Sequence, residues 1–223
     1  MSVQSTTSID VLKNTKQFLN KTVWLMGSGP SLDLFDLNLL RDQCVFALNA
    51  AITLISNNKF KNAWWIFRDV RICHQLGKKL DQWRSWRVIT HLRGYHEMRD
   101  VMNLKMKNVV AYLYNKDGIT HERTIIEDAL QLLKFIGISQ VNLIGIDHCV
   151  VKNQPYARDL MWKECFFYDP KKPHPEREIA PVQAMINSMI NLKPKLNNLK
   201  IYNTSPYYPD KSVFEFRDFK SLV

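Results

Sequence analysis

A short apolar run that leads into a glycine-containing turn is the feature that most constrains this chain. Residues 22–26 form the run, and Gly-Ser-Gly-Pro-Ser follows at residues 27–31. In such a turn glycine lets a phosphate approach the backbone N–H groups, and Ser31 is placed to cap the helix that four apolar side chains between residues 32 and 40 predict. The sequence therefore predicts an anion-binding turn on the first strand of an α/β domain. A tight strand-to-helix turn without a ligand remains the alternative.

Six further apolar or β-branched runs follow, as expected of strands that are covered on both faces. Helical patterns lie between them, most clearly at residues 120–136, where Gly137 supplies the stop, and at residues 180–192. This alternation predicts a doubly wound, mainly parallel α/β sheet. The seven predicted strands are Thr22–Met26, Cys44–Leu48, Ala63–Phe67, Arg87–Thr90, Asn108–Leu113, Val141–Ile144 and Leu199–Tyr202.

The length of 223 residues and the hydrophobic content of 46% predict one domain over residues 1–223. The segment of residues 148–179 is long and rich in aromatic residues and proline, which is typical of an active-site lid. Residues 1–20 are predicted to be a leading helix or arm, and residues 210–223 a strand or packing segment. No run is long enough to span a bilayer, no signal peptide is evident, and the four cysteines are widely spaced, so we expect a cytoplasmic protein with reduced thiols.

The formal net charge of +10 is concentrated in one segment. Residues 59–107 hold 12 Lys and Arg against 4 Asp and Glu, and four tryptophans are interleaved with them. Positive side chains mixed with stacking surfaces are typical of a surface that binds phosphates and bases. In the alternative reading the tryptophans belong to the core, which Trp64 and Trp65 are expected to do. The residues predicted to bind a polyanionic acceptor are Arg68, Arg71, Lys78, Lys79, Arg84 and Arg93.

Small, hydroxyl, amide and carboxylate side chains follow six of the predicted strands. Parallel strands end at one edge of a sheet, and ligands of open α/β sheets bind outside that edge. Each residue alone also suits a turn or a helix cap. Together they predict a nucleotide pocket, for which the candidates are Gly27, Ser28, Gly29, Ser31, Asn49, Asp69, Gly118, Thr120, His121, Asp147 and Ser205.

Five motifs in order carry a resemblance to a known family. They are Gly27–Leu32, Ala47–Asn49, Gly118–Thr120, Leu143–Asp147 and Tyr202–Pro206. With them residues 21–209 resemble the bacterial family 42 sialyltransferases. The chain also resembles a broader group that includes the glycosyltransferase domain of motility-associated, flagellin-modifying proteins and the archaeal hydroxymethylpterin pyrophosphokinase-like proteins.

The resemblance implies a Rossmann-like, metal-independent glycosyltransferase that uses a nucleotide sugar, such as a UDP- or CMP-sugar, and needs no further cofactor. By motif, residues 27–31 hold the nucleotide, Asn49 the nucleotide sugar, Thr120 and its neighbours the ribose or phosphate, and Asp147 the base end. Ser28 stands where the sialyltransferases usually have asparagine, which leaves the donor open. The lid histidine that acts as general base corresponds to His174.

The residues independently favour His174, because a histidine on a proline-rigid loop beside Glu176 is suited to accept a proton near neutral pH. Tyr156 and Tyr168 on the lid are predicted to donate hydrogen bonds to the leaving phosphate. No histidine pair has metal-ligand spacing, so no metal site is predicted. We thus expect an inverting transfer to a hydroxyl of a polyanionic acceptor, for which hydroxymethylated bases of phage DNA are one candidate.

Three alternatives remain open. They are a glycan-directed, sialyltransferase-like enzyme; an ATP-dependent, pterin pyrophosphokinase-like enzyme with Mg²⁺ at Asp69 and Asp147; and a non-catalytic nucleotide-binding or nucleic-acid-binding module. The sequence does not set the oligomeric state.

Overall fold

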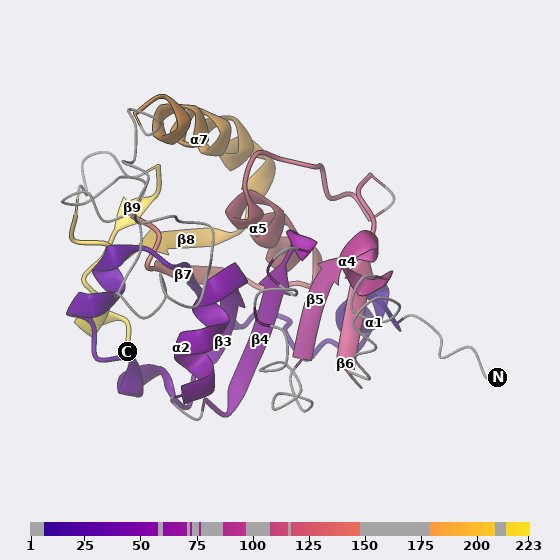
Figure 1. The fold of residues 1–223 in the computed structure, drawn as a ribbon, viewed down its shortest axis with the longest axis horizontal. Helices are drawn as coiled ribbons and strands as arrows, with labels where there is room; N and C mark the ends of the chain where they lie inside the picture. Colours follow the sequence, from indigo (N-terminus) through magenta and orange to yellow (C-terminus); the bar gives the residue numbers. More distant parts are fainter. Residues whose placement is uncertain are drawn as a thin grey trace.

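A computed structural model describes residues 7–57, 60–70, 72, 76, 87–96, 108–115, 117–147, 179–207 and 213–223. The described strands form one sheet in the order β1-β6-β5-β4-β3-β2-β7-β8-β9, and all neighbouring strands pair in parallel (Figure 1). The strands are β1 (Thr7–Ser8), β2 (Thr22–Met26), β3 (Cys44–Leu48), β4 (Asn62–Phe67), β5 (Arg87–His91), β6 (Asn108–Tyr112), β7 (Gln140–Ile144), β8 (Lys200–Asn203) and β9 (Glu215–Phe216).

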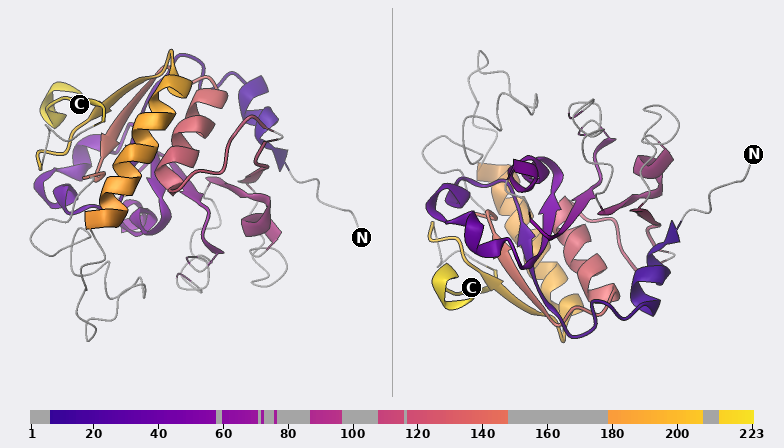
Figure 2. Two further views of the ribbon diagram at one scale, coloured as in Figure 1. Left: turned by 90° about the horizontal axis from the view of Figure 1, so that it is seen from above. Right: turned by 90° about the horizontal axis from the view of Figure 1, so that it is seen from below.

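Helices cover both faces of this sheet. Figure 2 shows α1, α5 and α7 side by side on one face, and α2 lies on the other. The helices are α1 (Ile9–Asn14), α2 (Ile52–Asn57), α4 (Leu92–His96), α5 (Ile125–Phe135) and α7 (Ile179–Leu192), and the 3₁₀ turns are η1 (Pro30–Leu34), η2 (Leu37–Leu40), η3 (Asn49–Ala51), η6 (Lys193–Leu196) and η8 (Phe219–Ser221).

A separate apolar core lies on each face, as the alternation of side chains along a strand requires. On β4, Trp64 packs with the core under α1, α5 and α7, whereas Trp65 packs with the core under α2. Their exposed fractions are 4% and 1%. The expectation that both tryptophans are core residues is confirmed, and they take no part in an acceptor surface.

The predicted doubly wound, parallel sheet is confirmed, and each of the seven predicted strands is observed to within one residue at either end. The helix predicted from residue 120 begins only at Ile125. The C-terminal segment packs as expected, since Phe219 meets the ring of Trp24 edge-on. Residues 148–178 of the predicted lid lie outside the described residues.

The helix predicted after residue 31 is wrong. The chain forms the 3₁₀ turns η1 and η2 instead, because Phe35 is extended and the carboxylate of Asp36 accepts the N–H of Asn38 and starts a second turn. Gly29 is the N-cap of η1, so Ser31 lies inside the turn rather than capping it.

The order of the strands reverses between β2 and β7. The connection from β2 to β3 passes through η1 and η2, whose Leu32, Leu37 and Leu40 join the core under α2. The chain enters β8 from α7, whose Met189 and Leu192 join the opposite core. Two neighbouring strands whose connections leave to opposite faces form a topological switch point, and ligands of open α/β sheets bind in the crevice outside it.

Within the described residues, no helix has the length and apolar character that crossing a membrane requires.

Candidate functional site

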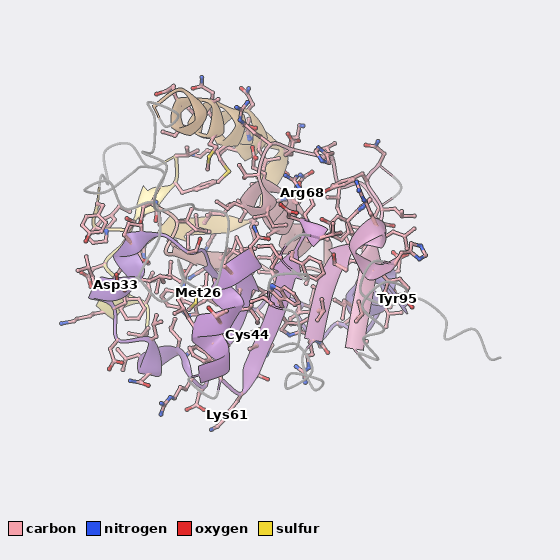
Figure 3. The ribbon with its side chains drawn as sticks, in the orientation of Figure 1. Met26, Asp33, Cys44, Lys61, Arg68 and Tyr95 are labelled. Atoms are coloured by element: carbon pink, nitrogen blue, oxygen red, sulfur yellow. The ribbon has the colours of Figure 1, made fainter. Side chains whose placement is uncertain are left out.

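The turn after β2 is bound to the turn after β7 at the switch point. Gly27 N–H donates to the carbonyl of Ile144 at 2.8 Å, and Gly29 N–H donates to the carbonyl of Gly145 at 2.7 Å. Met26, at the end of β2, is labelled in Figure 3. The two turns therefore continue the β2–β7 pairing beyond the sheet.

This close approach requires glycine at three positions. A Cβ atom on Gly27 would overlap the carbonyl oxygen of Gly145, and one on Gly29 would lie 2.5 Å from Oδ2 of Asp147. Gly145 has φ +66° and would press a Cβ atom against Leu32. The glycines of residues 27–31 are thus explained by backbone packing, whether or not a ligand binds there.

Asp147 forms a buried contact with the β2 turn. Its exposed fraction is 7%, and Oδ2 accepts the N–H of Ser31 at 2.9 Å. The other carboxylate oxygen, Oδ1, and the hydroxyl of Ser31 are buried without a hydrogen-bond partner in the described part of the chain. Buried polar atoms without partners are uncommon, and these two lie at the switch point, outside which ligands of open α/β sheets bind.

The internal bonds change the role that the β2 turn can have. The N–H groups of Gly27, Gly29 and Ser31 are used within the chain, so they are not free for a phosphate. Asp147 Oδ1 can only accept a hydrogen bond when ionised, whereas the Ser31 hydroxyl can donate or accept. These groups suit a ribose hydroxyl or a base amine better than they suit a phosphate.

Asn49 follows β3, which pairs with β2 through Met26 and Ala47. Its φ of +46° is uncommon for a residue other than glycine, though asparagine tolerates it best. Its carbonyl accepts the indole N–H of Trp65 at 2.9 Å, which holds the backbone in place. The side-chain Oδ1 has no partner within the described residues, so the constrained backbone holds an uncommitted amide oxygen at the same edge.

Ser205 is buried at the end of β8 beside β7. Its N–H donates to the side chain of Asn203, and its hydroxyl accepts the N–H of Tyr207 at 3.3 Å. Thr204 binds the carbonyl of Leu143 through its N–H and its hydroxyl. The structure thus brings together the predicted residues of the β2, β3, β7 and β8 ends.

A second polar cluster lies at the ends of β4 and β6. Arg68, labelled in Figure 3, follows β4 and donates to Oδ2 of Asp128 at 3.0 Å and to the carbonyls of Glu122 and Arg123. Tyr114 donates its hydroxyl to the same Oδ2 at 2.6 Å. These bonds use three of the guanidinium's N–H groups. If Arg68 binds a polyanionic acceptor substrate, it does so through its remaining N–H groups.

The beginning of α5 carries two carboxylates with an exposed fraction of 0%, those of Glu127 and Asp128. Glu127 accepts the N–H of Thr124 at 2.6 Å, and Asp128 accepts the N–H of Glu122 at 3.3 Å. Negative charge at a helix N-terminus is favourable, but it occupies the place that a phosphate would take. A phosphate is therefore disfavoured at this helix start.

Gly118 and Thr120 lie away from the switch point. The N–H of Thr120 donates to the side chain of Gln131 in the second half of α5 at 2.9 Å. Both residues line a groove of about 810 Å³ whose other walls include Lys13 of α1 and Lys134 of α5. The structure does not bring them together with Ser31 and Asp147.

Three rings gather beside Arg68. His91 stacks on Tyr114 with centroids 4.5 Å apart, and His121 meets Tyr114 edge-on at 4.7 Å. Burial is the main cause that lowers the pKa of His91. Burial also raises the pKa of Tyr114 to about 12, so its hydroxyl stays protonated near neutral pH.

Sequence reasoning missed Asp128 and Tyr114. Asp128 interrupts the apolar face predicted for residues 120–136, and a charged residue on such a face was the available signal that it has a buried partner. Tyr114 carried no signal, because its role depends on the bridge that it forms with Ile119 beyond β6.

Two further predicted residues are described, and others lie outside the described part. Arg93 is exposed on α4, and Asp69 follows β4 with an interaction of its own. Burial raises the pKa of the Cys44 thiol to about 11, which makes it a poor nucleophile. No group of three or more metal-ligating side chains occurs among the described residues. The residues outside the description are His174, Tyr156, Tyr168, Arg71, Lys78, Lys79 and Arg84.

Comparison with solved structures finds similar folds. The MAf glycosyltransferase of Magnetospirillum magneticum AMB-1 matches 98% of this chain and 39% of its own, with 12% identity and a TM-score of 0.60. Two Campylobacter jejuni proteins also match. The monofunctional alpha-2,3-sialyltransferase Cst-I has 14% identity and a TM-score of 0.53 over 92% of this chain and 80% of its own. The sialyltransferase CstII, in complex with the substrate analogue CMP-3FNeuAc, has 16% identity and a TM-score of 0.54 over 88% and 86%.

Neither a protein-family model nor a curated protein sequence matches the chain. The chain spans well under half of the MAf glycosyltransferase. At these identities the likeness shows a shared α/β fold, and the chain has the fold of these three glycosyltransferases.

Proposed function

We propose that this protein is a glycosyltransferase that takes its sugar from a nucleotide sugar. The observation that carries the proposal is the switch point between β2 and β7, where buried oxygens of Ser31, Asp147 and Asn49 have no partner among the described residues. The shared fold with three glycosyltransferases supports it.

In this proposal the nucleoside lies outside β2 and β7. Asp147 Oδ1 accepts a hydrogen bond from a ribose hydroxyl or a base amine, and the Ser31 hydroxyl bonds the same moiety. The amide of Asn49 reaches the phosphate or the sugar. Since the β2 turn uses its own N–H groups internally, the leaving phosphate depends on other donors, for which Tyr156 and Tyr168 are proposed.

The proposed reaction is a metal-independent inversion. The acceptor oxygen forms a bond to the anomeric carbon while the bond to the phosphate oxygen breaks, and His174 takes the proton from the acceptor hydroxyl. The nucleotide leaves with the electron pair of the broken bond. His174→Ala is expected to abolish transfer without weakening nucleotide binding.

Two acceptor classes are compatible with the sequence. The excess positive charge of residues 59–107 favours a polyanion, of which DNA with hydroxymethylated bases is an example, and Lys78, Lys79 and Arg93 would contact it. A glycan acceptor is favoured instead by the pairing of Arg68 with Asp128, because it removes one positive charge from that surface.

The experiment is a thermal-shift screen with CMP, UDP, GDP and ATP, each with EDTA and with Mg²⁺. A ligand that binds only the folded state stabilises it by mass action and so raises Tm. The gain in unfolding free energy is about 2.7 kcal/mol at a hundredfold excess over Kd. Stabilisation by CMP or UDP in EDTA supports the proposal and names the donor. Stabilisation by ATP with Mg²⁺ alone would replace it with a pyrophosphokinase, and no stabilisation by any nucleotide would contradict both.

A further inference from the structure

A row of positive side chains lies along the amino edge of the sheet, where the parallel strands begin. Lys200 and Arg87 are the first residues of β8 and β5, Lys21 and Lys61 directly precede β2 and β4, and Arg41 lies three residues before β3. All five side chains are exposed. We name these five residues the basic edge.

Backbone hydrogen bonds join neighbouring members of the basic edge. The N–H of Lys200 donates to the carbonyl of Ser139 at 2.9 Å, and the N–H of Ser139 donates to the carbonyl of Lys21 at 3.1 Å. The N–H of Lys61 donates to the carbonyl of Arg41 at 3.0 Å. From β5 to β8 the row crosses five strand spacings, which is about 24 Å. The five cations therefore form one surface instead of scattered charges.

Little negative charge offsets the basic edge. Within the described residues its one ion pair joins Lys61 to Asp42, and the two side chains are 74% and 72% exposed. Because water screens so exposed a pair, the pair contributes little. Five cations and one carboxylate leave a net charge of +4 on this part of the described surface. A surface of this kind attracts a partner with closely spaced negative charges.

The basic edge lies at the opposite end of the strands from the proposed donor site. Figure 3 shows Lys61 and Arg68 at the two ends of β4, and seven residues at about 3.3 Å each separate them by about 23 Å. Of the four described cations of residues 59–107, Lys61 and Arg87 belong to the basic edge, whereas Arg68 and Arg93 follow β4 and β5. An acceptor hydroxyl held at the basic edge is too far from a donor sugar outside β2 and β7. The basic edge therefore fits an anionic partner other than the acceptor.

Two exposed leucines lie among these cations. Leu19 precedes Lys21 by two residues and is 49% exposed, and Leu39 precedes Arg41 by two residues and is 50% exposed. The phosphate backbone of a nucleic acid offers an exposed leucine no apolar contact. A bilayer offers it the boundary between the headgroups and the acyl chains, while lysine and arginine contact the lipid phosphates. The mixture of cations and leucines thus favours a lipid surface.

From this combination we propose that the basic edge binds the surface of a membrane that contains anionic phospholipids. The five cations contact the headgroup phosphates, and Leu19 and Leu39 enter the boundary beneath them. The strands then point away from the membrane, so the switch point between β2 and β7 faces the aqueous phase. This anchoring does not depend on the proposed glycosyl transfer.

The test is flotation of the purified protein with vesicles of phosphatidylcholine alone and of phosphatidylcholine mixed with phosphatidylglycerol. We expect binding to the anionic vesicles only, with loss of that binding in about 1 M salt, where the Debye length is about 3 Å. Lys21→Gln combined with Lys200→Gln removes two cations and should weaken binding about thirtyfold. Leu19→Ser should weaken it about fivefold.

Arg93→Gln combined with Arg123→Gln is the matched control. It removes the same charge from two exposed arginines near the carboxyl ends of the strands, so it should bind the anionic vesicles as the wild type does. Since the four substituted cations are exposed, both double variants should unfold at the temperature of the wild type.

Three results would overturn the proposal. The first is a wild-type protein that does not float with the anionic vesicles, or that floats equally with phosphatidylcholine alone. The second is an equal loss of binding in the two double variants, because it would show a response to net charge and not to the basic edge. The third is binding of a DNA duplex that the basic-edge variant loses, without vesicle binding by the wild type, because it would assign the surface to nucleic acid.

Discussion

Two regions of the sheet edge, the β2/β7 switch point and the ends of β4 to β6, are built by opposite means. At the β2/β7 switch point the turns fit because side chains are absent, and a Cβ atom on Gly27 or Gly29 would strike Gly145 or Asp147. At the ends of β4 to β6 the fit depends on side chains that are present, in the contacts among Arg68, Asp128 and Tyr114.

This difference determines what each end leaves available for a ligand. Backbone packing at the switch point uses N–H groups and leaves side-chain oxygens that have no partner in the described part of the chain. The charged network uses its polar groups internally, and the rings of His91, Tyr114 and His121 beside it pack against one another. The first region is thus suited to hydrogen-bonded recognition of a nucleoside, whereas the polar groups of the second hold its own connections in place.

The largest expected effect is on stability at the switch point. Gly27→Ala places a Cβ atom against backbone that cannot move without breaking the β2–β7 continuation, so we expect a loss of about 3 kcal/mol or more, or no folded protein. Urea unfolding measures it. Gly118→Ala is the control, because its Cβ atom meets open space and only the φ of +69° is unfavourable; about 1 kcal/mol is expected. Equal losses in the two variants would refute the packing argument.

The second-largest effect on stability is expected when the buried carboxylate of Asp128 is removed. Asp128→Ala leaves Arg68 unpaired and two further donors unsatisfied, and we expect a loss of about 3–5 kcal/mol of unfolding free energy. In Arg68→Ala combined with Asp128→Ala the loss should be clearly less than the sum of the single losses. Additive losses in this double-mutant cycle would show that the pair does not interact.

Asp147→Asn separates stability from binding. The amide oxygen can still accept the N–H of Ser31, so unfolding free energy should change by less than about 1 kcal/mol. The NH₂ group replaces the partnerless acceptor, and nucleotide affinity should fall about tenfold by calorimetry. Unchanged affinity would remove Asp147 from the donor site.

The smallest effect is on the pH dependence of stability. The pKa of His91 is lowered from 6.5 in the folded protein, with burial the main cause, Asp128 opposing it, and His121, Arg68 and Arg93 adding to it. The unfolded state then binds more protons below pH 6.5, so the stability due to neutral His91 is complete above that value and is lost as the pH falls further. Because the ring is half-exposed, we expect less than about 1 kcal/mol. Urea curves of wild type and His91→Phe between about pH 5 and 8 measure it, and parallel pH profiles would contradict it.

The strands and the switch-point residues could be predicted because they follow local patterns. Apolar runs give strands. Gly27 and Asn49 each follow a strand directly, and Asp147 comes three residues after the end of β7. The 3₁₀ turns from Pro30 onward could not be predicted, since the spacing of Leu32, Phe35, Leu39 and Leu40 also fits an α-helix.

The network around Asp128 could not be predicted, because Arg68 is 60 residues away in sequence. Gly118 and Thr120 follow β6 as expected. The connection from β6 to α5, however, brings Thr120 to Gln131 in the second half of α5, away from the switch point. The sequence places residues at strand ends, whereas only the path of each connection decides which strand ends meet one ligand.

The most direct test of the account is calorimetric titration of Asn49→Gly with the nucleotide that stabilises the wild type. Glycine accepts the φ of +46° and keeps the carbonyl that Trp65 binds, while the amide whose oxygen has no partner among the described residues is removed. The account predicts unchanged or higher stability with affinity about tenfold weaker, and unchanged affinity in His91→Ala. Full affinity in Asn49→Gly together with reduced affinity in His91→Ala would place the nucleotide at the other end of the sheet edge and contradict the account.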